Sequence, residues 1–278
     1  MPGTLYIVAT PIGNLGDITF RAVETLRSVD LIACEDTRHT RKLLSHLGIK
    51  KPTVSYHEHN EAECSAELLK QLQSGTSIAL VSDAGTPAIS DPGFRIVKLA
   101  AGSEIEVVSV PGPSAVIAAL SVAGLPTDAF YFGGFLPSKS GERLRRLEEL
   151  AAIPGTLIFY EGPHRLLRTF ADCLTVLGDR QAVTARELTK VHEEIIRGRL
   201  SELVSHFEQT PPRGELVLLI DRGSEKERAK TGQTTIAERV AELEAAGQDQ
   251  RSALRQAARE FGLSRSEAYR ELQHAKKS

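Results

Sequence analysis

Short apolar segments rich in β-branched residues alternate with amphipathic stretches along the first half of the chain. The apolar segments, which we expect to be strands, are residues 5–9, 30–34, 53–56, 77–82 and 105–110. The stretches between them include residues 19–28, 37–47 and 61–73, where apolar side chains recur on one face of a helix. Strands that are apolar almost throughout are typical of a parallel sheet covered by helices on both faces. The sequence therefore predicts an α/β domain.

The same alternation resumes after the turn-rich segment GLPTD, residues 124–128. Strands are expected at residues 129–133, 156–161, 181–186, 193–199 and 215–221. No helical pattern separates the third of these strands from the fourth, so the second sheet should be mixed. We predict two α/β domains, an N-terminal one over residues 1–124 and a second one over residues 125–222.

A polar linker, residues 222–233, leads to helical patterns that predict a helical extension over residues 234–278. Thr235 with Glu238, and Ser264 with Glu267, fit the capping box that starts a helix. The segment FGLS, residues 261–264, predicts the turn of a helix-turn-helix unit. Such units bind nucleic acid in some proteins and serve packing or dimerisation in others.

The overall composition is that of an ordinary globular protein, with 278 residues, 41% of them hydrophobic, and a net charge of −2. A surface that is basic throughout is excluded, so a nucleic acid would have to bind to a local basic patch. The three cysteines, Cys34, Cys64 and Cys173, show neither a disulfide framework nor metal-ligand spacing. No run of apolar residues approaches the length of a membrane span. We expect a cytoplasmic protein without a bound metal.

Three loops rich in glycine and proline each follow a predicted strand and precede a predicted helix. They are TPIGNLGD (residues 10–17), SDAGTPAISDPG (residues 82–93) and PGPSA (residues 111–115). Ligands of open parallel sheets bind outside the carboxyl ends of the strands. One such loop is most often structural, but three on one edge favour a ligand site. The fingerprints GxxxxGK[ST] and GxGxxG are absent from the sequence, which favours a nucleoside ligand over a nucleotide phosphate.

Seven longer motifs occur in order: ATPIGNLGDIT, ACEDTRHTRKLL, SYHEHNE, VSDAGTPAISDPG, PGPSA, FYEGPHR and ARELTKVHEE. From residue 4 to about residue 220 the chain thereby closely resembles the ribosomal RNA small subunit methyltransferase I family, within the tetrapyrrole methylase superfamily. One departure is visible. Where the family usually has Glu-Ser-Pro-His-Arg, Gly162 stands between Glu161 and Pro163, which removes one hydroxyl that could form a hydrogen bond.

The resemblance implies an S-adenosylmethionine-dependent enzyme that methylates the ribose 2′-oxygen of a cytidine in the decoding region of 16S rRNA. It also implies a homodimer, an rRNA substrate within the small ribosomal subunit, and a cofactor held in the cleft between the two α/β domains. By motif position, the residues expected to bind the cofactor are Pro11, Asp83, Gly85, Thr86, Pro87, Ile89, Ser114, Ala115, Tyr160 and Glu187.

A ribose hydroxyl is a weak nucleophile at neutral pH, so a carboxylate or imidazole should help to remove its proton. Candidates follow the second and third predicted strands: Glu35, Asp36, His39, His57, Glu58 and His59. We favour Asp36 and His57 as catalytic residues, because loops at strand ends face the cleft. The alternative is that each acid caps a helix or pairs with a nearby arginine, and Asp36 directly precedes a predicted helix.

Phosphate groups of RNA require cations. The residues expected to contact the substrate are Arg38, Arg41, Arg165, Arg186 and Lys190. Arginines of the expected helix over residues 138–150, such as Arg143, are also available, although a run of this kind is more often a solvated helix face. Aromatic residues make up only 5% of the chain, with no tryptophan, so base stacking should not dominate RNA recognition.

Two other functions remain open from the sequence. A tetrapyrrole methyltransferase would use the same cofactor cleft but would need a broad apolar trough for its macrocycle, whereas the segments SYHEHNE and EDTRHTR are polar. A DNA-binding regulator would use the α/β part as a ligand sensor and the C-terminal helices as the reader. The predicted helix over residues 264–275 has only a thin basic face for that purpose.

Overall fold

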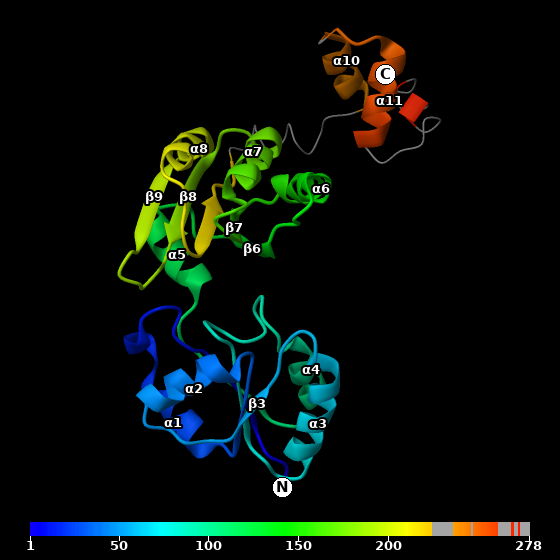
Figure 1. Ribbon diagram of the computed structural model, residues 1–278. Coiled ribbons are helices and arrows are strands. Elements are labelled where there is room, and N and C mark those ends of the chain that lie inside the picture. Colours follow the sequence, from blue (N-terminus) through cyan, green and yellow to red (C-terminus); the bar gives the residue numbers. More distant parts are fainter. Residues whose placement is uncertain (224–235, 246, 261–267, 270–271, 273–278) are drawn as a thin grey trace.

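The computed structural model describes residues 1–223, 236–245, 247–260, 268–269 and 272. Its N-terminal part contains a parallel five-stranded sheet in the order β3-β2-β4-β1-β5 (Figure 1). The strands are β1 (Leu5–Val8), β2 (Leu31–Cys34), β3 (Thr53–Ser55), β4 (Ile78–Val81) and β5 (Val107–Val110). The predicted parallel sheet is confirmed, and each strand lies within the segment that the sequence predicted.

Helices cover both faces of this first sheet. They are α1 (Phe20–Ser28), α2 (Thr37–His46), α3 (Glu61–Gln73) and α4 (Phe94–Gly102), and a short 3-10 helix, η1, spans Leu15–Asp17. Alternate residues of each strand point to opposite faces. Ala79 and Val81 of β4 therefore pack with α1 and α2, whereas Ile78 and Leu80 pack with α3 and α4. The strands are apolar along nearly their whole length because both of their faces are buried.

The second sheet has the order β6-β7-β10-β8-β9. Its strands are β6 (Phe130–Phe135), β7 (Thr156–Glu161), β8 (Gln181–Arg186), β9 (Glu194–Arg199) and β10 (Leu216–Ile220). β6 and β7 are parallel, and the other neighbouring pairs are antiparallel. The predicted mixed sheet is confirmed. One face packs against the helices α6 (Ser140–Ala151), α7 (Leu166–Leu177) and α8 (Leu200–Gln209).

Helix α5 (Ala115–Ala123) follows the last strand of the first sheet but packs against the second one (Figure 1). Val116 and Leu120 lie in one apolar cluster with Ile158 and Leu219. The guanidinium of Arg197 in β9 donates a hydrogen bond to the carbonyl of Ala123 at the end of this helix (3.1 Å). The chain passes between the two sheets ahead of α5. The domain boundary near residue 125 stays a prediction, and this packing favours a boundary nearer residue 114.

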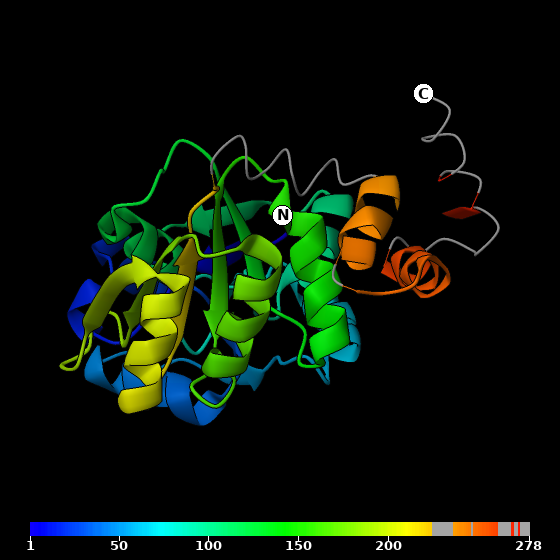
Figure 2. The same ribbon diagram turned by 90° about the horizontal axis from the view of Figure 1, so that it is seen from above.

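Two C-terminal helices, α10 (Ile236–Ala245) and α11 (Gln250–Glu260), have an apolar cluster of their own and lie to one side of the two sheets in Figure 2. Val240 and Leu243 pack there with Leu254 and Ala257, and Arg239 pairs with Glu260 at 2.7 Å. The predicted turn at residues 261–264 and both predicted capping boxes lie wholly or partly outside the described residues. Among the helices that are described, none has the length and apolar character needed to cross a membrane.

Candidate active site

The three loops singled out in the sequence lie next to one another, because β4, β1 and β5 are neighbours in the first sheet. The loop after β1 is joined to the loop after β4 by a pair of backbone hydrogen bonds. The amide of Thr10 donates to the carbonyl of Gly85 (2.9 Å), and the amide of Gly85 donates to the carbonyl of Thr10 (3.1 Å). The Thr10 hydroxyl also donates to the carbonyl of Ser82 (3.0 Å). The carboxyl edge of the sheet is thus a fixed platform.

The loop after β4 contains unusual backbone conformations. Ala88 and Ser90 both have positive φ, 68° and 63°, in the left-handed region that side chains rarely adopt. Each such residue costs on the order of 1–3 kcal/mol and persists only where its surroundings enforce it. Strain of this kind clusters at binding and catalytic sites, which supports the prediction that this loop serves a ligand.

The far end of that loop is anchored by Glu61, the first residue of α3. Its Oε1 accepts hydrogen bonds from the backbone amides of Gly93 (3.1 Å) and Arg95 (3.3 Å) at the start of α4. The buried Tyr56 hydroxyl donates to the same oxygen (3.0 Å). Burial, with the nearby carboxylate, raises the pKa of Tyr56 far above its usual range, so this hydroxyl stays a donor. The SYHEHNE motif therefore fixes the loop, a role that the sequence analysis missed.

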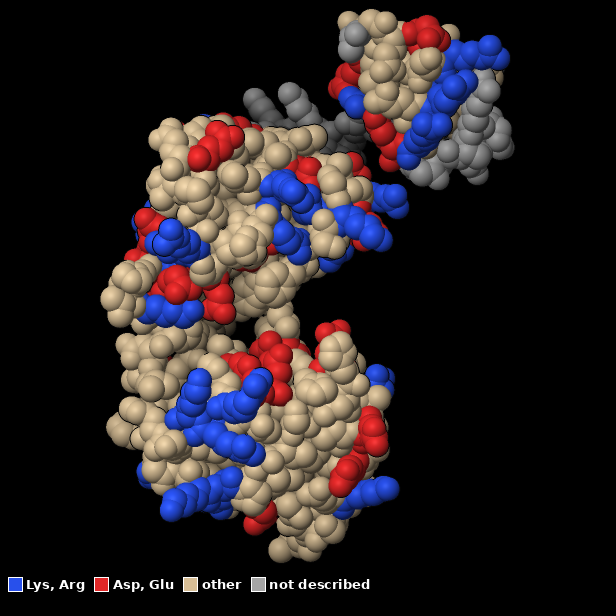
Figure 3. Space-filling model, viewed as in Figure 1, with Lys and Arg blue, Asp and Glu red and all other residues tan. Residues whose placement is uncertain are grey.

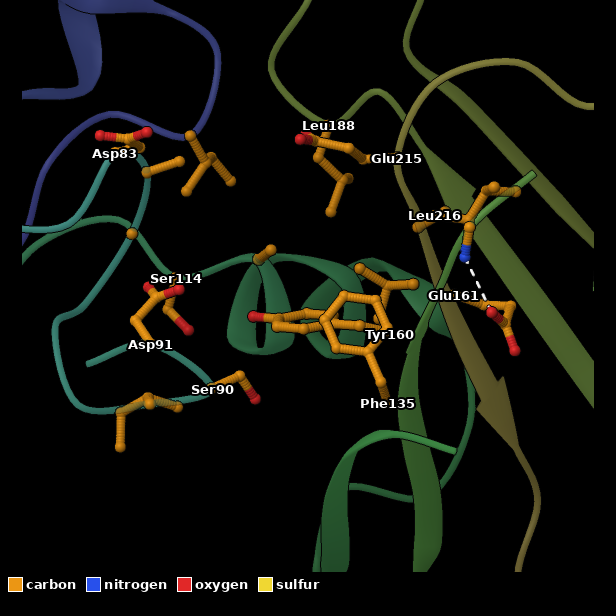
Figure 4. A pocket seen from close by; sticks show the side chains of 18 of the residues that line it. Asp83, Ser90, Asp91, Ser114, Phe135, Tyr160, Glu161, Leu188, Glu215 and Leu216 are labelled. Carbon is orange, nitrogen blue, oxygen red and sulfur yellow. Dashed lines mark hydrogen bonds between the residues drawn. The ribbon is translucent and has the colours of Figure 1, made fainter. Parts of the chain in front are cut away.

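A cavity of about 370 Å³ lies between the carboxyl edge of the first sheet and the second sheet (Figure 4). Its lining includes seven of the ten residues predicted to bind the cofactor: Asp83, Gly85, Thr86, Ile89, Ser114, Ala115 and Tyr160. Of the other three, Pro11 and Glu187 each precede a lining residue, Ile12 and Leu188, and Pro87 follows one. The structure therefore brings most of the predicted set to one place.

Glu187 is engaged in holding the loop between β8 and β9. Its Oε1 accepts hydrogen bonds from the backbone amide of Glu215 (3.0 Å) and from Nζ of Lys190 (3.0 Å). The Glu215 amide, with help from Lys190, lowers the pKa of Glu187. The same loop reaches the first sheet, because the amide of Asn14 donates to the hydroxyl of Thr189 (3.0 Å). This loop thus ties the two α/β units together beside the cavity.

One wall of the cavity is acidic. Glu35, Asp83 and Asp91 all line it. Burial, followed by the carboxylates of Asp91 and Asp83, raises the pKa of Glu35. Burial likewise raises the pKa of Asp91, with Asp83 adding to the effect and a hydrogen bond with Ser82 opposing it. Negative charge gathered in a partly buried site is stabilised by a bound cation.

The opposite wall is largely apolar and belongs to the second sheet. The ring of Tyr160 lies 4.9 Å from that of Phe132 and 5.6 Å from that of Phe135, measured between centroids. In Figure 4 the Tyr160 hydroxyl points across the cavity toward the side that carries Ser114 and Asp91. Leu188 and Val217 complete this wall. A ligand with a flat apolar part and a cationic part would match the two walls.

The favoured proton acceptors lie elsewhere. Among the described residues that line the cavity, neither Asp36 nor His57 occurs. Asp36 caps α2, with its Oδ1 accepting from the amide of Arg38 (2.7 Å), and its carboxylate pairs with the Arg38 side chain at 3.1 Å. These bonds lower the pKa of Asp36. His57 is half-buried, and its Nδ1 has no hydrogen-bond partner among the described residues.

Glu161 and Gly162 line the cavity although the sequence analysis assigned them no role. Glu161 is buried, and its Oε2 accepts from the hydroxyl of Thr169 (2.5 Å). Its Oε1 accepts from the amide of Gly162 (2.9 Å) and pairs with Nε of Arg165 at 3.3 Å. The turn that carries the departure from the family motif is thus bonded through the backbone amide of Gly162, which does not depend on the side chain at this position.

The basic side chains differ in how free they are. Arg165, Arg186 and Lys190 form ion pairs with Glu161, Glu194 and Glu187 respectively, each within 3.3 Å. Arg143 is 3% exposed and pairs with Asp172 at 2.6 Å, so the expectation that it is available to RNA is wrong. Arg38 and Arg41 of α2 are exposed, although Arg38 also has a carboxylate partner, Asp36, at 3.1 Å. Figure 3 shows Lys and Arg side chains gathered over this part of the first unit, next to acidic side chains at the cleft.

The protein has a parallel sheet and a mixed sheet, and a cavity lies between them. Loops at the carboxyl edge of the parallel sheet line this cavity. These features define a class of two-domain α/β ligand-binding proteins. Within that class, the model of the Tetrapyrrole (Corrin/Porphyrin) Methylases matches residues 4–204. The chain belongs to this family.

Several curated relatives are called "Ribosomal RNA small subunit methyltransferase I", and two of them illustrate the similarity. The one from Synechocystis is 49% identical over 268 residues, which cover 96% of each chain. The one from Vibrio cholerae is 54% identical over 219 residues, which cover 78% of this chain and 76% of the relative. A solved structure of uroporphyrin-III C-methyl transferase from Thermus thermophilus, complexed with S-adenosyl homocysteine, matches with a TM-score of 0.56 at 20% identity. That match covers 78% of this chain and 97% of the other, and it shows the shared fold.

Proposed function

We propose that this protein transfers a methyl group from S-adenosylmethionine to 16S rRNA of the small ribosomal subunit, at the ribose 2′-oxygen of a decoding-region cytidine. The observation that carries the proposal is the two-walled cavity at the carboxyl edge of the first sheet. The same chain is about half identical in sequence to proteins that are named as small subunit rRNA methyltransferases. The name of the family points to tetrapyrroles as well, but the relatives at this level of identity carry the rRNA name.

The cavity suits the methyl donor on both walls. The adenosyl part has an apolar surface available between Tyr160, Leu188 and Val217. The sulfonium and amino groups carry positive charge, which the wall of Glu35, Asp83 and Asp91 would stabilise. The loops after β1, β4 and β5 would bind the methyl donor through backbone groups and through Thr86 and Ser114. Both of these residues belong to the set predicted to bind the cofactor. Pro11, Pro87 and Glu187 would then act by shaping these loops.

S-adenosylmethionine supplies a methyl group that is already activated for displacement. The task of the chain is to hold the accepting oxygen in line with that group and to keep water out of the site. The ribose hydroxyl must also lose its proton, and a carboxylate in the cavity can accept it. Among the candidates that the sequence offered, Glu35 is the one that lines the cavity, so we propose Glu35 ahead of Asp36 and His57.

The substrate RNA would approach over α2 of the first unit. Arg38 and Arg41 are exposed there and can reach phosphate oxygens. Arg38, Arg165, Arg186 and Lys190 would contact RNA by sharing their present carboxylate partners or by exchanging them for phosphate. A cytoplasmic location and a homodimer remain parts of the proposal, as does the assembled small subunit as substrate.

The test is methyl transfer from tritiated S-adenosylmethionine to small ribosomal subunits isolated from cells that lack this protein. The labelled nucleotide is then mapped and digested to distinguish a ribose from a base modification. We expect label on a single ribose of 16S rRNA. Label on a base would remove the 2′-oxygen as the acceptor, and the absence of label from all RNA would remove the proposed function.

A further inference from the structure

Strand β6 changes its side-chain alternation at Gly133 and Gly134. Phe132 pairs with Ile158, but the next paired residue, Phe135, is opposite Tyr160, so two residues of β6 face one residue of β7. This arrangement is a β-bulge, which shifts all later side chains to the other face of the sheet. Tyr131 and Leu136 accordingly both pack with the core on the α6 and α7 side. Phe135 is thereby turned to the cavity side.

The two glycines are suited to this bulge. Gly134 has a φ of +62°, which disfavours any other residue. A Cβ atom at Gly133 would lie 2.7 Å from the ring of Phe159, closer than real contacts allow. A Cβ atom at Gly134 would lie 3.2 Å from the hydroxyl of Ser90, so the bulge comes against the loop after β4 of the first unit. Bulges next to active sites commonly re-aim a side chain.

Phe135 is 59% exposed even though it lines the cavity. Across the cleft, Ile89 also lines the cavity and is 49% exposed. Ile89 stands between Ala88 and Ser90, whose positive φ values are described above. Two large apolar side chains are thus held out at the mouth of one cavity, one from each unit, and each next to a left-handed backbone residue. Figure 4 shows Phe135 and Ser90 at the same end of the cavity.

We propose that Phe135 and Ile89 form a slot at the mouth of the cavity that receives the base of the nucleotide to be methylated, with the Phe135 ring stacked on that base. The inference rests on the proposed function and names a specificity element for it. Enzymes that modify a nucleotide bring it out of its stack, and aromatic side chains take over the lost stacking. A single stacking ring is compatible with the scarcity of aromatic residues in this chain.

The exposed fractions of the lining residues distinguish the part of the cavity assigned to the RNA base from the part assigned to the adenine of the donor. Val217 is 4% exposed, Leu216 2% and Ala185 1%, so this part of the lining is buried, whereas Phe135 and Ile89 are exposed. The donor is assigned to the buried part. A polymer reaches the cavity only from its open side, where Phe135 and Ile89 lie. Ile89, assigned to the donor by resemblance, would then lie between donor and base.

The test compares Phe135→Ala, Phe135→Leu and Phe135→Tyr with the unaltered protein. Phe130→Ala is the matched control, since Phe130 is 44% exposed on the same strand but is not part of the described cavity lining. Two quantities are measured: the KM for small ribosomal subunits in tritiated methyl transfer, and the Kd for adenosylhomocysteine by calorimetry. Unchanged binding of adenosylhomocysteine also reports that each variant is folded.

Loss of one stacked base should raise the KM about tenfold or more in Phe135→Ala. Phe135→Leu should resemble Phe135→Ala, whereas Phe135→Tyr and Phe130→Ala should stay near the unaltered protein. The Kd for adenosylhomocysteine should change in none of them. A weakened Kd with an unchanged KM would assign Phe135 to the donor and overturn the inference, as would an unchanged KM in Phe135→Ala. If the unaltered protein binds adenosylhomocysteine but methylates no RNA, the proposed function itself fails, and this assignment with it.

Discussion

Neighbouring carboxylates after β2 have opposite environments in this protein. Glu35 faces the cavity, and burial together with Asp91 and Asp83 raises its pKa above the ordinary 4.5. Asp36, the next residue, caps α2 beside Arg38, which lowers its pKa. A carboxylate that accepts a proton near neutral pH benefits from a raised pKa. This contrast is the physical reason to place the proton acceptor at Glu35.

Glu35→Gln should therefore reduce methyl transfer by about a hundredfold or more, with much less effect on donor affinity. In the unaltered protein the rate should fall as the pH drops through the pKa of Glu35, which burial and the nearby Asp91 and Asp83 carboxylates raise. That acid limb should be missing from the residual activity of the variant. Rates measured from pH 5 to 9 provide the check. Should Asp36→Asn lose the activity instead, with Glu35→Gln unaffected, the original choice of Asp36 holds.

Asp91 provides a stability prediction with a definite sign. Because its folded-state pKa is raised, its ionised form destabilises the fold, and that penalty grows as the pH rises through the raised pKa. Asp91→Asn should therefore raise the Tm of the donor-free protein at pH 7 by a few degrees and weaken donor binding. Asp36, whose pKa is lowered, stabilises the fold when ionised, so Asp36→Asn should not raise the Tm. Thermal unfolding of both variants decides the matter, and a lower Tm for Asp91→Asn would contradict the account.

The roles of individual residues were harder to predict from the sequence than the helices and strands. The motifs placed Asp83, Thr86 and Tyr160 at the cavity, because each belongs to a long segment at a strand end. Phe135 left no such signal. Its orientation depends on a bulge whose register is set by pairing with β7, and a plain alternating pattern places it on the other face. Whether a charged side chain is available to bind RNA also depends on its partner within the protein, as the burial of Arg143 against Asp172 shows.

At the scale of elements, the loop after β4 is held at its start by Thr10 and at its end by Glu61. Glu61→Ala would leave the amides of Gly93 and Arg95 without their acceptor. We expect the loop to open more often and the donor to bind about tenfold more weakly, since an unmet amide costs on the order of 1–3 kcal/mol. Hydrogen exchange of residues 83–95 and calorimetry with adenosylhomocysteine test this.

Glu61→Gln serves as the matched variant, because its amide oxygen can still accept these hydrogen bonds. It should retain most of the donor affinity and most of the protection from exchange. Equal loss in both variants would mean that the charge of Glu61, and not its role as an acceptor, holds the loop.

The elements themselves were well predicted, for a physical reason. Strands such as β4 and β10 are buried on both faces, so their apolar runs are unbroken and end at turn residues. The antiparallel pair of β8 and β9 was visible because no helix fits between them. The association of α5 with the second sheet was not visible, since an apolar helix carries no mark of the sheet it covers.

At the scale of the whole molecule, the cavity is built from both α/β units, and its described lining contains no residue of α10 or α11. Ending the chain after Arg222 should therefore leave the Kd for adenosylhomocysteine within about twofold of the full-length value, because its contacts are retained. The helices α10 and α11 have their own apolar cluster, so their removal should not expose the core of either sheet. A loss of donor binding on truncation would show that the extension supports the cavity.

The most direct measurement of the central claim is calorimetric titration of adenosylhomocysteine into the unaltered protein and into Ala115→Phe. Ala115 lines the cavity at the start of α5, and a phenylalanine there would fill space that the donor needs, whereas Ile117→Phe adds a ring at an exposed position of the same helix. We predict saturable binding by the unaltered protein and by Ile117→Phe, and binding weakened about a hundredfold or more in Ala115→Phe at an unchanged Tm. Equal affinity in all three proteins, or no binding by the unaltered one, would contradict a methyl-donor site in this cavity.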